Sequence, residues 1–183
     1  MPPTLATPND AGLRAMSAKY IPPAIPVLLA ILGAVVANIP ITFIGGWMPP
    51  PMFALMPLYF WCLVRPDLVP PAWVLVVGVL QDLFSGGPPG MWSLAFVVTY
   101  VLIDRQRETY AGLSGSGAIL GFATAALLAT LTAYITFAVY YWKLLPLQAF
   151  VIQFAVTVVF YVPVAMLLGF IHRRLIGPLR SEV

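Results

Sequence analysis

The sequence contains very few charged residues: 8% of its 183 residues are charged, whereas 61% are hydrophobic. A soluble domain of this length needs a far more polar surface, so the composition excludes an ordinary water-soluble fold. The mean hydropathy of +0.96 is typical of a chain that lipid solvates. We therefore expect an all-α integral membrane protein, because a helix satisfies its own backbone hydrogen bonds in lipid.

Cysteine and histidine are also scarce. The chain has one cysteine, Cys62, and one histidine, His172, so an intrachain disulfide is excluded and a Cys/His metal site is disfavoured. The apolar runs show no Ser–His or Ser–Lys dyad, no His/Glu cluster and no multi-Asp motif for Mg²⁺-diphosphate. We therefore predict no catalytic residues, no metal and no other cofactor.

The nine basic residues occur in clusters that separate long apolar runs. Because ~20 residues of helix cross a bilayer, these runs predict six crossings, at 24–44, 50–64, 68–84, 91–103, 117–140 and 147–170. Both termini then lie on the cytoplasmic side (N-in/C-in) with every basic residue except Lys143. This positive-inside distribution indicates a multi-pass protein of the bacterial inner membrane. Contact with anionic lipid headgroups explains the net charge of +3 better than nucleic-acid binding does.

The predicted domain organisation is simple. Residues 1–19 are polar and proline-rich, and we expect a disordered cytoplasmic tail there, followed by one six-helix transmembrane domain at 20–183. The fourth crossing has only about 13 apolar residues, ~20 Å of helix against a hydrocarbon core of ~30 Å. Either the bilayer is thinner there or the turn at 85–90 lies below the outer surface. We favour the second explanation, which predicts a depression in the outer face beside this turn.

Asp82 is the one acidic residue inside an apolar run, and a Gly/Pro turn at 85–90 follows it. Because a carboxylate at the centre of a membrane helix costs ~2.5–3.5 kcal/mol, a specific role is expected. Three roles remain open: hydrogen bonding to the amides of the turn, contact with a partner protein, and binding of a proton or cation for transport. The glycines and prolines of the turn predict a tight helical hairpin.

Small residues recur at every fourth position of the fifth crossing: Gly117, Gly121, Ala125, Ala129 and Ala133. Such a stripe lets a second helix approach closely. Two interpretations remain open, packing within the bundle and docking of a partner's transmembrane helix.

The segment 78–90, GVLQDLFSGGPPG, resembles the most recognisable stretch of the MreD family of rod shape-determining membrane proteins. The family pattern is Gly-apolar-apolar-x-Asp-apolar-apolar-Ser-Gly-x-Pro-x-Gly, and the matching positions here are Gly78, Asp82, Ser85, Gly86, Pro88 and Gly90. The resemblance implies a non-enzymatic inner-membrane scaffold of the elongasome, the complex that elongates the peptidoglycan cell wall and maintains cell shape.

The same resemblance implies MreC as a partner, together with MreB, a RodA-type polymerase and a class B penicillin-binding protein. It also implies a bundle similar to the substrate-binding S components of energy-coupling-factor (ECF) transporters. On this basis we expect the single transmembrane helix of MreC to dock on the bundle, with Gly121 and Ala125 in the contact. Two alternatives remain: a solute-binding membrane subunit of an ECF-type vitamin transporter, with a ligand cavity near the turn, and a proton-coupled transporter that uses Asp82.

Overall fold

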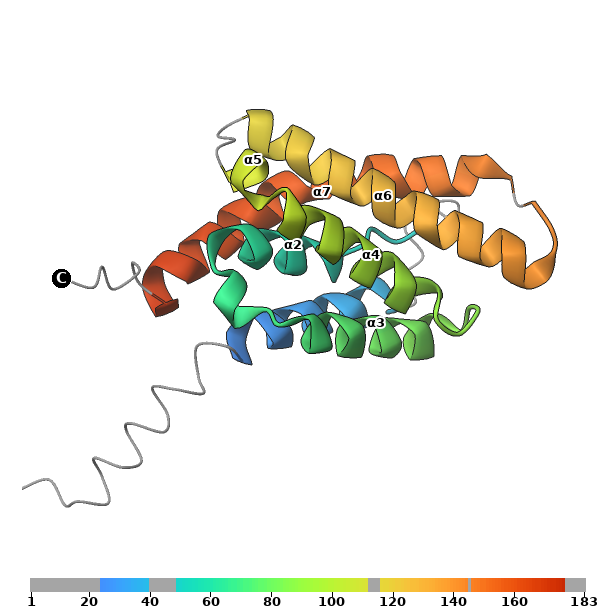
Figure 1. Cartoon of the computed structure of the whole chain (residues 1–183), viewed down its shortest axis with the longest axis horizontal. Coiled ribbons are helices and arrows are strands. Elements are labelled where there is room, and N and C mark those ends of the chain that lie inside the picture. The colour runs from blue at the N-terminus through green and yellow to red at the C-terminus, as the bar shows by residue number, and fades with distance from the viewer. Residues whose placement is uncertain (1–23, 40–48, 112–115, 145, 177–183) are drawn as a thin grey trace, which may run out of the picture.

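The computed structural model describes residues 24–39, 49–111, 116–144 and 146–176. Every regular element in these ranges is helical, as predicted (Figure 1). The longer helices are the N-terminal helix (Ala24–Ala37), α2 (Leu55–Val64), α3 (Pro71–Ser85), α4 (Met91–Arg105), α6 (Ser116–Tyr141) and α7 (Leu147–Ile171). The shorter segments are η2 (Pro66–Leu68), α5 (Arg107–Ala111) and η3 (His172–Ile176). The predicted tail at 1–19 and the end of the first predicted crossing lie outside the described residues.

Helix length distinguishes two of these helices from the others. The segments Gly117–Tyr141 and Leu147–Arg174 are long and apolar enough to cross a membrane. In contrast, α2 has 10 residues and α3 and α4 have 15 each, which is ~15 Å and ~22 Å of helix against a hydrocarbon core of ~30 Å. Length and composition therefore identify two candidate crossings in the described part of the chain, and the six-crossing arrangement stays a prediction.

The second apolar run is only partly helical. Residues 50–52 have no regular structure and 53–54 form a turn that leads into α2. The prolines at 49, 50 and 51 lack backbone N–H donors, and each disfavours the α conformation of the residue before it. The prediction of a helix over 50–64 is therefore wrong for its first five residues.

The helices run along the long axis of the molecule (Figure 1). The α3 and α4 helices pair as neighbours, α4 packs on α6, α6 packs on α7, and α2 contacts α4, α6 and α7. The aromatic rings of Phe122 on α6 and Tyr161 on α7 stack with their centroids 3.8 Å apart. The ring of Tyr59 on α2 meets Phe122 edge-on at 5.3 Å. The aromatic core therefore lies where α2, α6 and α7 meet.

The small residues of α6 lie inside the bundle. Gly121, Ala125, Ala129 and Ala133 are buried, and Gly117 is half-buried. Because small side chains let neighbouring helices approach closely, α4 and α7 pack directly on α6. The protein's own helices therefore cover most of this stripe, and its docking to MreC stays an untested prediction. Packing within the bundle is the interpretation that agrees with the burial.

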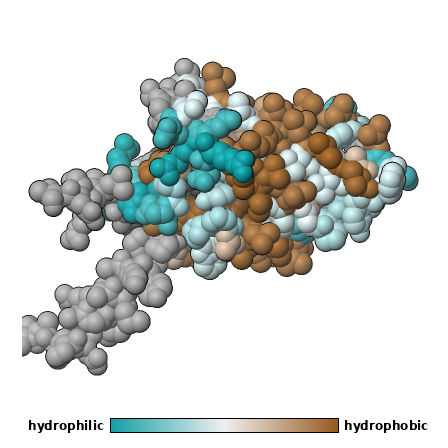
Figure 2. Space-filling model, viewed as in Figure 1, coloured by the Kyte–Doolittle hydropathy of each residue, from teal (hydrophilic) through white to brown (hydrophobic). Residues whose placement is uncertain are grey.

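Polar and apolar surfaces separate along the bundle (Figure 2). Charged side chains belong to the α2–α3 connection, the segment from Asp104 to Glu108 and the end of α7, which lie at one end of the molecule (Figure 1). The α3–α4 turn and the α6–α7 connection, which contains Lys143, lie at the other end. Between the ends, apolar side chains are exposed, for example Leu131 and Val159. Apolar exposure on this scale marks a surface that other apolar molecules cover.

An ion pair lies at the charged end. Arg65 and Asp67 approach to 2.9 Å between the guanidinium nitrogen and the carboxylate oxygen. The hydrogen bonds from the Arg65 guanidinium hold the pKa of the Asp67 carboxyl below its usual range. Because the Asp67 side chain is 56% exposed, water screens this pair and its contribution to stability is small.

Candidate functional site

The segment with the MreD-like pattern forms a helical hairpin of α3, a turn and α4. Gly86 ends α3 with a φ of 62°, and Gly90 precedes α4 with a φ of 89°. Both angles lie in the left-handed region, where a Cβ atom is strained. Pro88 lies between these glycines and is fully buried. The two glycines and the buried proline together fix the reversal of the chain, as the sequence predicts.

The Asp82 carboxylate holds this hairpin together. Its Oδ1 accepts a hydrogen bond from the Trp92 backbone N–H at 2.7 Å. Its Oδ2 accepts bonds from the backbone N–H groups of Gly90 and Ser93, both at 3.1 Å, and from the Ser93 hydroxyl at 2.6 Å. The three backbone N–H groups lie at the start of α4, where they have no partner within the helix. A negative charge at this position is also favourable to the helix dipole. Of the three roles considered for Asp82, hydrogen bonding to the turn amides is the one present in these contacts.

Two further motif residues act in the same hairpin. A Cβ atom placed on Gly78 would lie 2.5 Å from the Cα atom of Ser93, so the α3–α4 spacing requires glycine at this position. The Ser85 hydroxyl donates to the Asp82 carbonyl at 3.2 Å at the end of α3. The structure therefore brings together the six residues of the MreD-like pattern, whereas the small residues of α6 belong to a separate packing surface.

Side chains of α7 form hydrogen bonds with backbone groups of the non-helical segment before α2. The Met52 backbone N–H donates to the Thr157 hydroxyl at 3.0 Å, and the Gln153 side-chain amide donates to the Pro50 carbonyl at 3.1 Å. The Thr157 hydroxyl in turn donates to the Gln153 carbonyl at 2.6 Å. Irregular backbone is tolerated at membrane depth when protein groups satisfy it in this way. Polar residues four positions apart in an apolar helix, together with three consecutive prolines, were the sequence signals of this arrangement.

A small cavity, here called the polar pocket, lies between the N-terminal helix, residues 50–54, α3, α4 and α7. It has about 60 Å³ of space for the centres of water-sized atoms. Its lining residues are Ala37, Asn38, Pro50, Pro51, Met52, Ala54, Gln81, Ser85, Trp92, Phe96 and Gln153. Gln81 and Asp82 are adjacent in sequence, yet only Gln81 lines this pocket, because successive helical residues point to different sides.

A second hollow, here called the hairpin groove, runs along the other side of α3 and α4. It is open to the surface and mostly apolar, and it reaches Thr136 on α6 at its far side. Its lining residues are Leu75, Val79, Asp82, Leu83, Gly86, Gly87, Pro89, Gly90, Ser93, Leu94, Val97 and Thr136. The polar pocket and the hairpin groove both adjoin the turn beside which the sequence predicts a depression.

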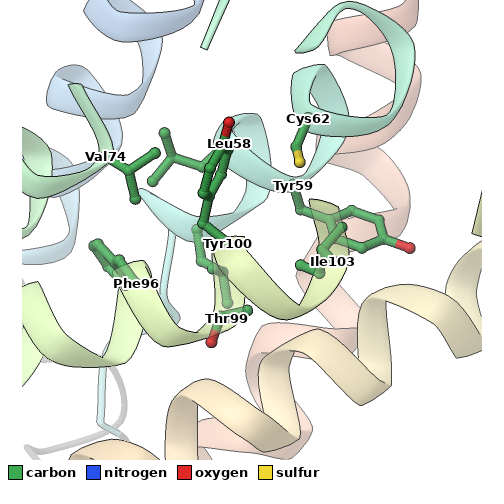
Figure 3. Close-up of a pocket in the computed structure, with 9 residues that line it drawn as sticks. Leu58, Tyr59, Cys62, Val74, Phe96, Thr99, Tyr100 and Ile103 are labelled. Atoms are coloured by element: carbon green, nitrogen blue, oxygen red, sulfur yellow. The ribbon is translucent and has the colours of Figure 1, made fainter. Parts of the chain in front are cut away.

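The core cavity in Figure 3 differs in character from both hollows. Side chains of α2, α3 and α4 surround it, including Leu58, Val74, Phe96 and Tyr100 (Figure 3). It has about 10 Å³ of space for the centres of water-sized atoms, which is room for one water molecule at most. The Tyr100 hydroxyl donates to the Val69 carbonyl at 2.9 Å. This cavity is a packing void rather than a ligand site.

Comparison with known proteins gives no assignment: no family model, no curated protein and no solved structure matches the chain. In the described ranges, no group of three His, Cys, Asp or Glu side chains is placed to hold a metal ion. The functional interpretation therefore depends on the geometry of the hairpin and on its two hollows.

Proposed function

We propose that the chain is an integral protein of the bacterial inner membrane that crosses the bilayer six times with both termini in the cytoplasm. The basic clusters lie at one end of the bundle, and the α3–α4 turn and the α6–α7 connection lie at the other, which supports this topology (Figure 1). The exposed apolar band between the two ends also supports it (Figure 2). The short α2 is extended by residues 49–54, whose backbone groups bond to α7, so a broken helix serves as the second crossing.

We further propose that the protein is a non-enzymatic scaffold of the MreD type in the elongasome. One observation carries this proposal: each motif residue from Gly78 to Gly90 has a structural role in one rigid hairpin, and Asp82 makes four hydrogen bonds in it. Both oxygens of this buried carboxylate are occupied by donors of the hairpin itself, which supports a structural role for Asp82. A rigid hairpin with an open groove beside it is suited to holding another membrane helix.

The hairpin groove is the proposed contact for the transmembrane helix of MreC. It offers the exposed apolar side chains of Leu75, Val79, Leu83 and Leu94 along two neighbouring helices. In lipid, helix association depends on close packing into such a groove, since apolar surface alone gives no preference over lipid tails. MreB, the RodA-type polymerase and the class B penicillin-binding protein then join through MreC.

Co-purification with affinity-tagged MreC tests this proposal. Val79 in the groove is 44% exposed, and Val162 on α7, outside the groove, is 41% exposed, which makes the two valines a matched pair. Val79→Trp fills the groove and should lower recovery of the complex about tenfold, because overpacking costs ~1–3 kcal/mol. Val162→Trp should leave recovery unchanged. Equal recovery with both variants would exclude the groove as the MreC contact.

A further inference from the structure

The connection between α6 and α7 contains a strained, exposed tryptophan. Trp142 directly follows α6 with a φ of 52°, and no other residue except glycine has a positive φ in the described ranges. In this left-handed region the Cβ atom approaches the following carbonyl oxygen, so a bulky residue is strained. A strained conformation persists only where other interactions hold it. Because Trp142 is 90% exposed, few contacts within the chain are available to its side chain, and an interaction outside the chain is expected.

The residues around Trp142 share its exposure and form what is here called the aromatic end: Tyr140, Tyr141, Trp142, Lys143 and Leu144. The rings of Tyr140 and Tyr141 meet edge-on with their centroids 4.9 Å apart. Trp and Tyr each combine a large apolar ring with a polar N–H or O–H group. Lys143 has its positive charge at the end of an apolar stem. The polar members of the aromatic end are therefore suited to a boundary between an apolar medium and water.

Helix length places the aromatic end beyond the hydrocarbon core in the proposed topology. The 26 residues of α6 extend ~39 Å against a core of ~30 Å. In Figure 1 the α6–α7 connection extends further along the molecule than the α3–α4 turn at the same end. The apolar surface continues up to this point, because Val139 on α6 and Leu147 on α7 are both exposed. The surface that lipid tails cover in this topology therefore borders directly on the aromatic end.

We propose that the aromatic end inserts among the phospholipid headgroups of the outer leaflet and fixes the depth of α6 and α7 there. This proposal rests on the proposed membrane topology. Trp and Tyr favour the headgroup layer, because the apolar part of each ring lies against acyl chains while its polar group stays hydrated. The Lys143 ammonium pairs with lipid phosphate in the same layer. With the aromatic end at this depth, the shorter α3–α4 hairpin ends below the headgroups, and its turn is recessed in the outer face.

Fluorine nuclear magnetic resonance of the fluorotryptophan-labelled full chain in phosphatidylglycerol–phosphatidylcholine nanodiscs measures this depth. Three paramagnetic probes are compared: a lipid with a nitroxide on its headgroup, a lipid with a nitroxide at the end of its acyl chain, and a water-soluble gadolinium chelate. Trp142→Phe assigns the Trp142 signal. Leu131→Trp supplies a control reporter at an exposed position of the same helix, about three turns earlier.

The headgroup nitroxide should broaden the Trp142 signal severalfold more than either other probe does, and the chain-end nitroxide should broaden the Leu131→Trp signal most. Strongest broadening of the Trp142 signal by gadolinium would place the ring in water, and by the chain-end nitroxide in the acyl layer; either result would overturn the proposal. A Trp142 signal insensitive to all three probes would mean that protein, such as a second copy of the chain, covers the ring, which would also overturn it. If gadolinium broadened the Leu131→Trp signal most, the membrane topology itself would fail, which separates that failure from a misplaced aromatic end.

Discussion

Removal of the Asp82 carboxylate should loosen the hairpin without changing the apolar surface of the bundle. Asp82→Ala deletes four hydrogen bonds, three of them from backbone N–H groups at the start of α4. The hydrogen bonds from the N–H groups of Trp92 and Ser93 to the carboxylate are buried, so water does not readily take the place of the deleted carboxylate as acceptor. The nearly isosteric Asp82→Asn keeps one acceptor oxygen but turns an NH₂ group toward N–H donors.

The expected magnitude follows from two opposing effects. Hydrogen bonds to a charged group contribute ~1.5–3 kcal/mol each, so four bonds at the lower end give about 6 kcal/mol. In the proposed six-crossing arrangement, removing the carboxylate also removes the cost of keeping it in the bilayer; this cost is about 3 kcal/mol at a helix centre, which is an upper limit for Asp82 near the end of α3. The net loss for Asp82→Ala is therefore at least about 3 kcal/mol, and for Asp82→Asn the loss is smaller with the same sign.

Thermal unfolding in detergent measures this loss. A change of about 3 kcal/mol in a chain of this length lowers Tm by about 6–12 °C. The control is Asp67→Asn, which removes an exposed carboxylate from an ion pair worth ~0–1 kcal/mol. If Asp82→Ala shifted Tm no more than Asp67→Asn does, the carboxylate would not hold the hairpin and the reasoning would fail.

Three further outcomes are expected. Gly78→Ala should destabilise the protein by several kcal/mol in the same Tm assay, because the added methyl group meets the α4 backbone. Its control is Gly169→Ala, which has open space around the Cβ position and should stabilise the protein by ~0.5–1 kcal/mol. Thr157→Val should cost ~1–3 kcal/mol, because it leaves a buried amide of the segment before α2 without an acceptor; a Tm equal to that of the unaltered protein would contradict this. In a cysteine-free background, Lys143→Cys should react with a membrane-impermeant maleimide on spheroplasts while Glu108→Cys should react only after lysis; the reverse pattern would exclude the proposed orientation.

The hairpin was the most predictable part of the molecule. Its sequence signals are local. The left-handed backbone angles at 86 and 90 favour glycine, and a lone carboxylate in an apolar run needs donors, which the nearby turn supplies. The ends of α6 and α7 were equally clear, because long apolar runs end at the polar or proline-containing segments that flank them. Both features depend on residues that are close together in the sequence.

Two other features depend on contacts between distant segments, so the sequence left the role of the α6 stripe open and did not show how residues 50–52 are held. The stripe of α6 has the same pattern whether its partner is α4 or another protein, and only the packed bundle shows that Ala129 and Ala133 are buried. The pairing of residues 50–52 with Gln153 and Thr157 joins positions about a hundred residues apart. The apolar length of the segment predicts a helix from residue 50 onward. Residues 50–52 are instead non-helical, and hydrogen bonds from α7 satisfy their backbone groups.

The bonds between residues 50–52 and α7 also constrain how the protein is made. A chain emerges from the ribosome with its N-terminal part first, so in the proposed topology the proline-rich segment before α2 reaches the bilayer before Gln153 and Thr157 have been synthesised. Until they arrive, the Met52 amide and the Pro50 carbonyl need water or lipid headgroups as partners. Synthesis of α7 is therefore needed before the segment that precedes α2 can reach its final conformation, and a nascent chain that ends before α7 leaves these backbone groups without their protein partners.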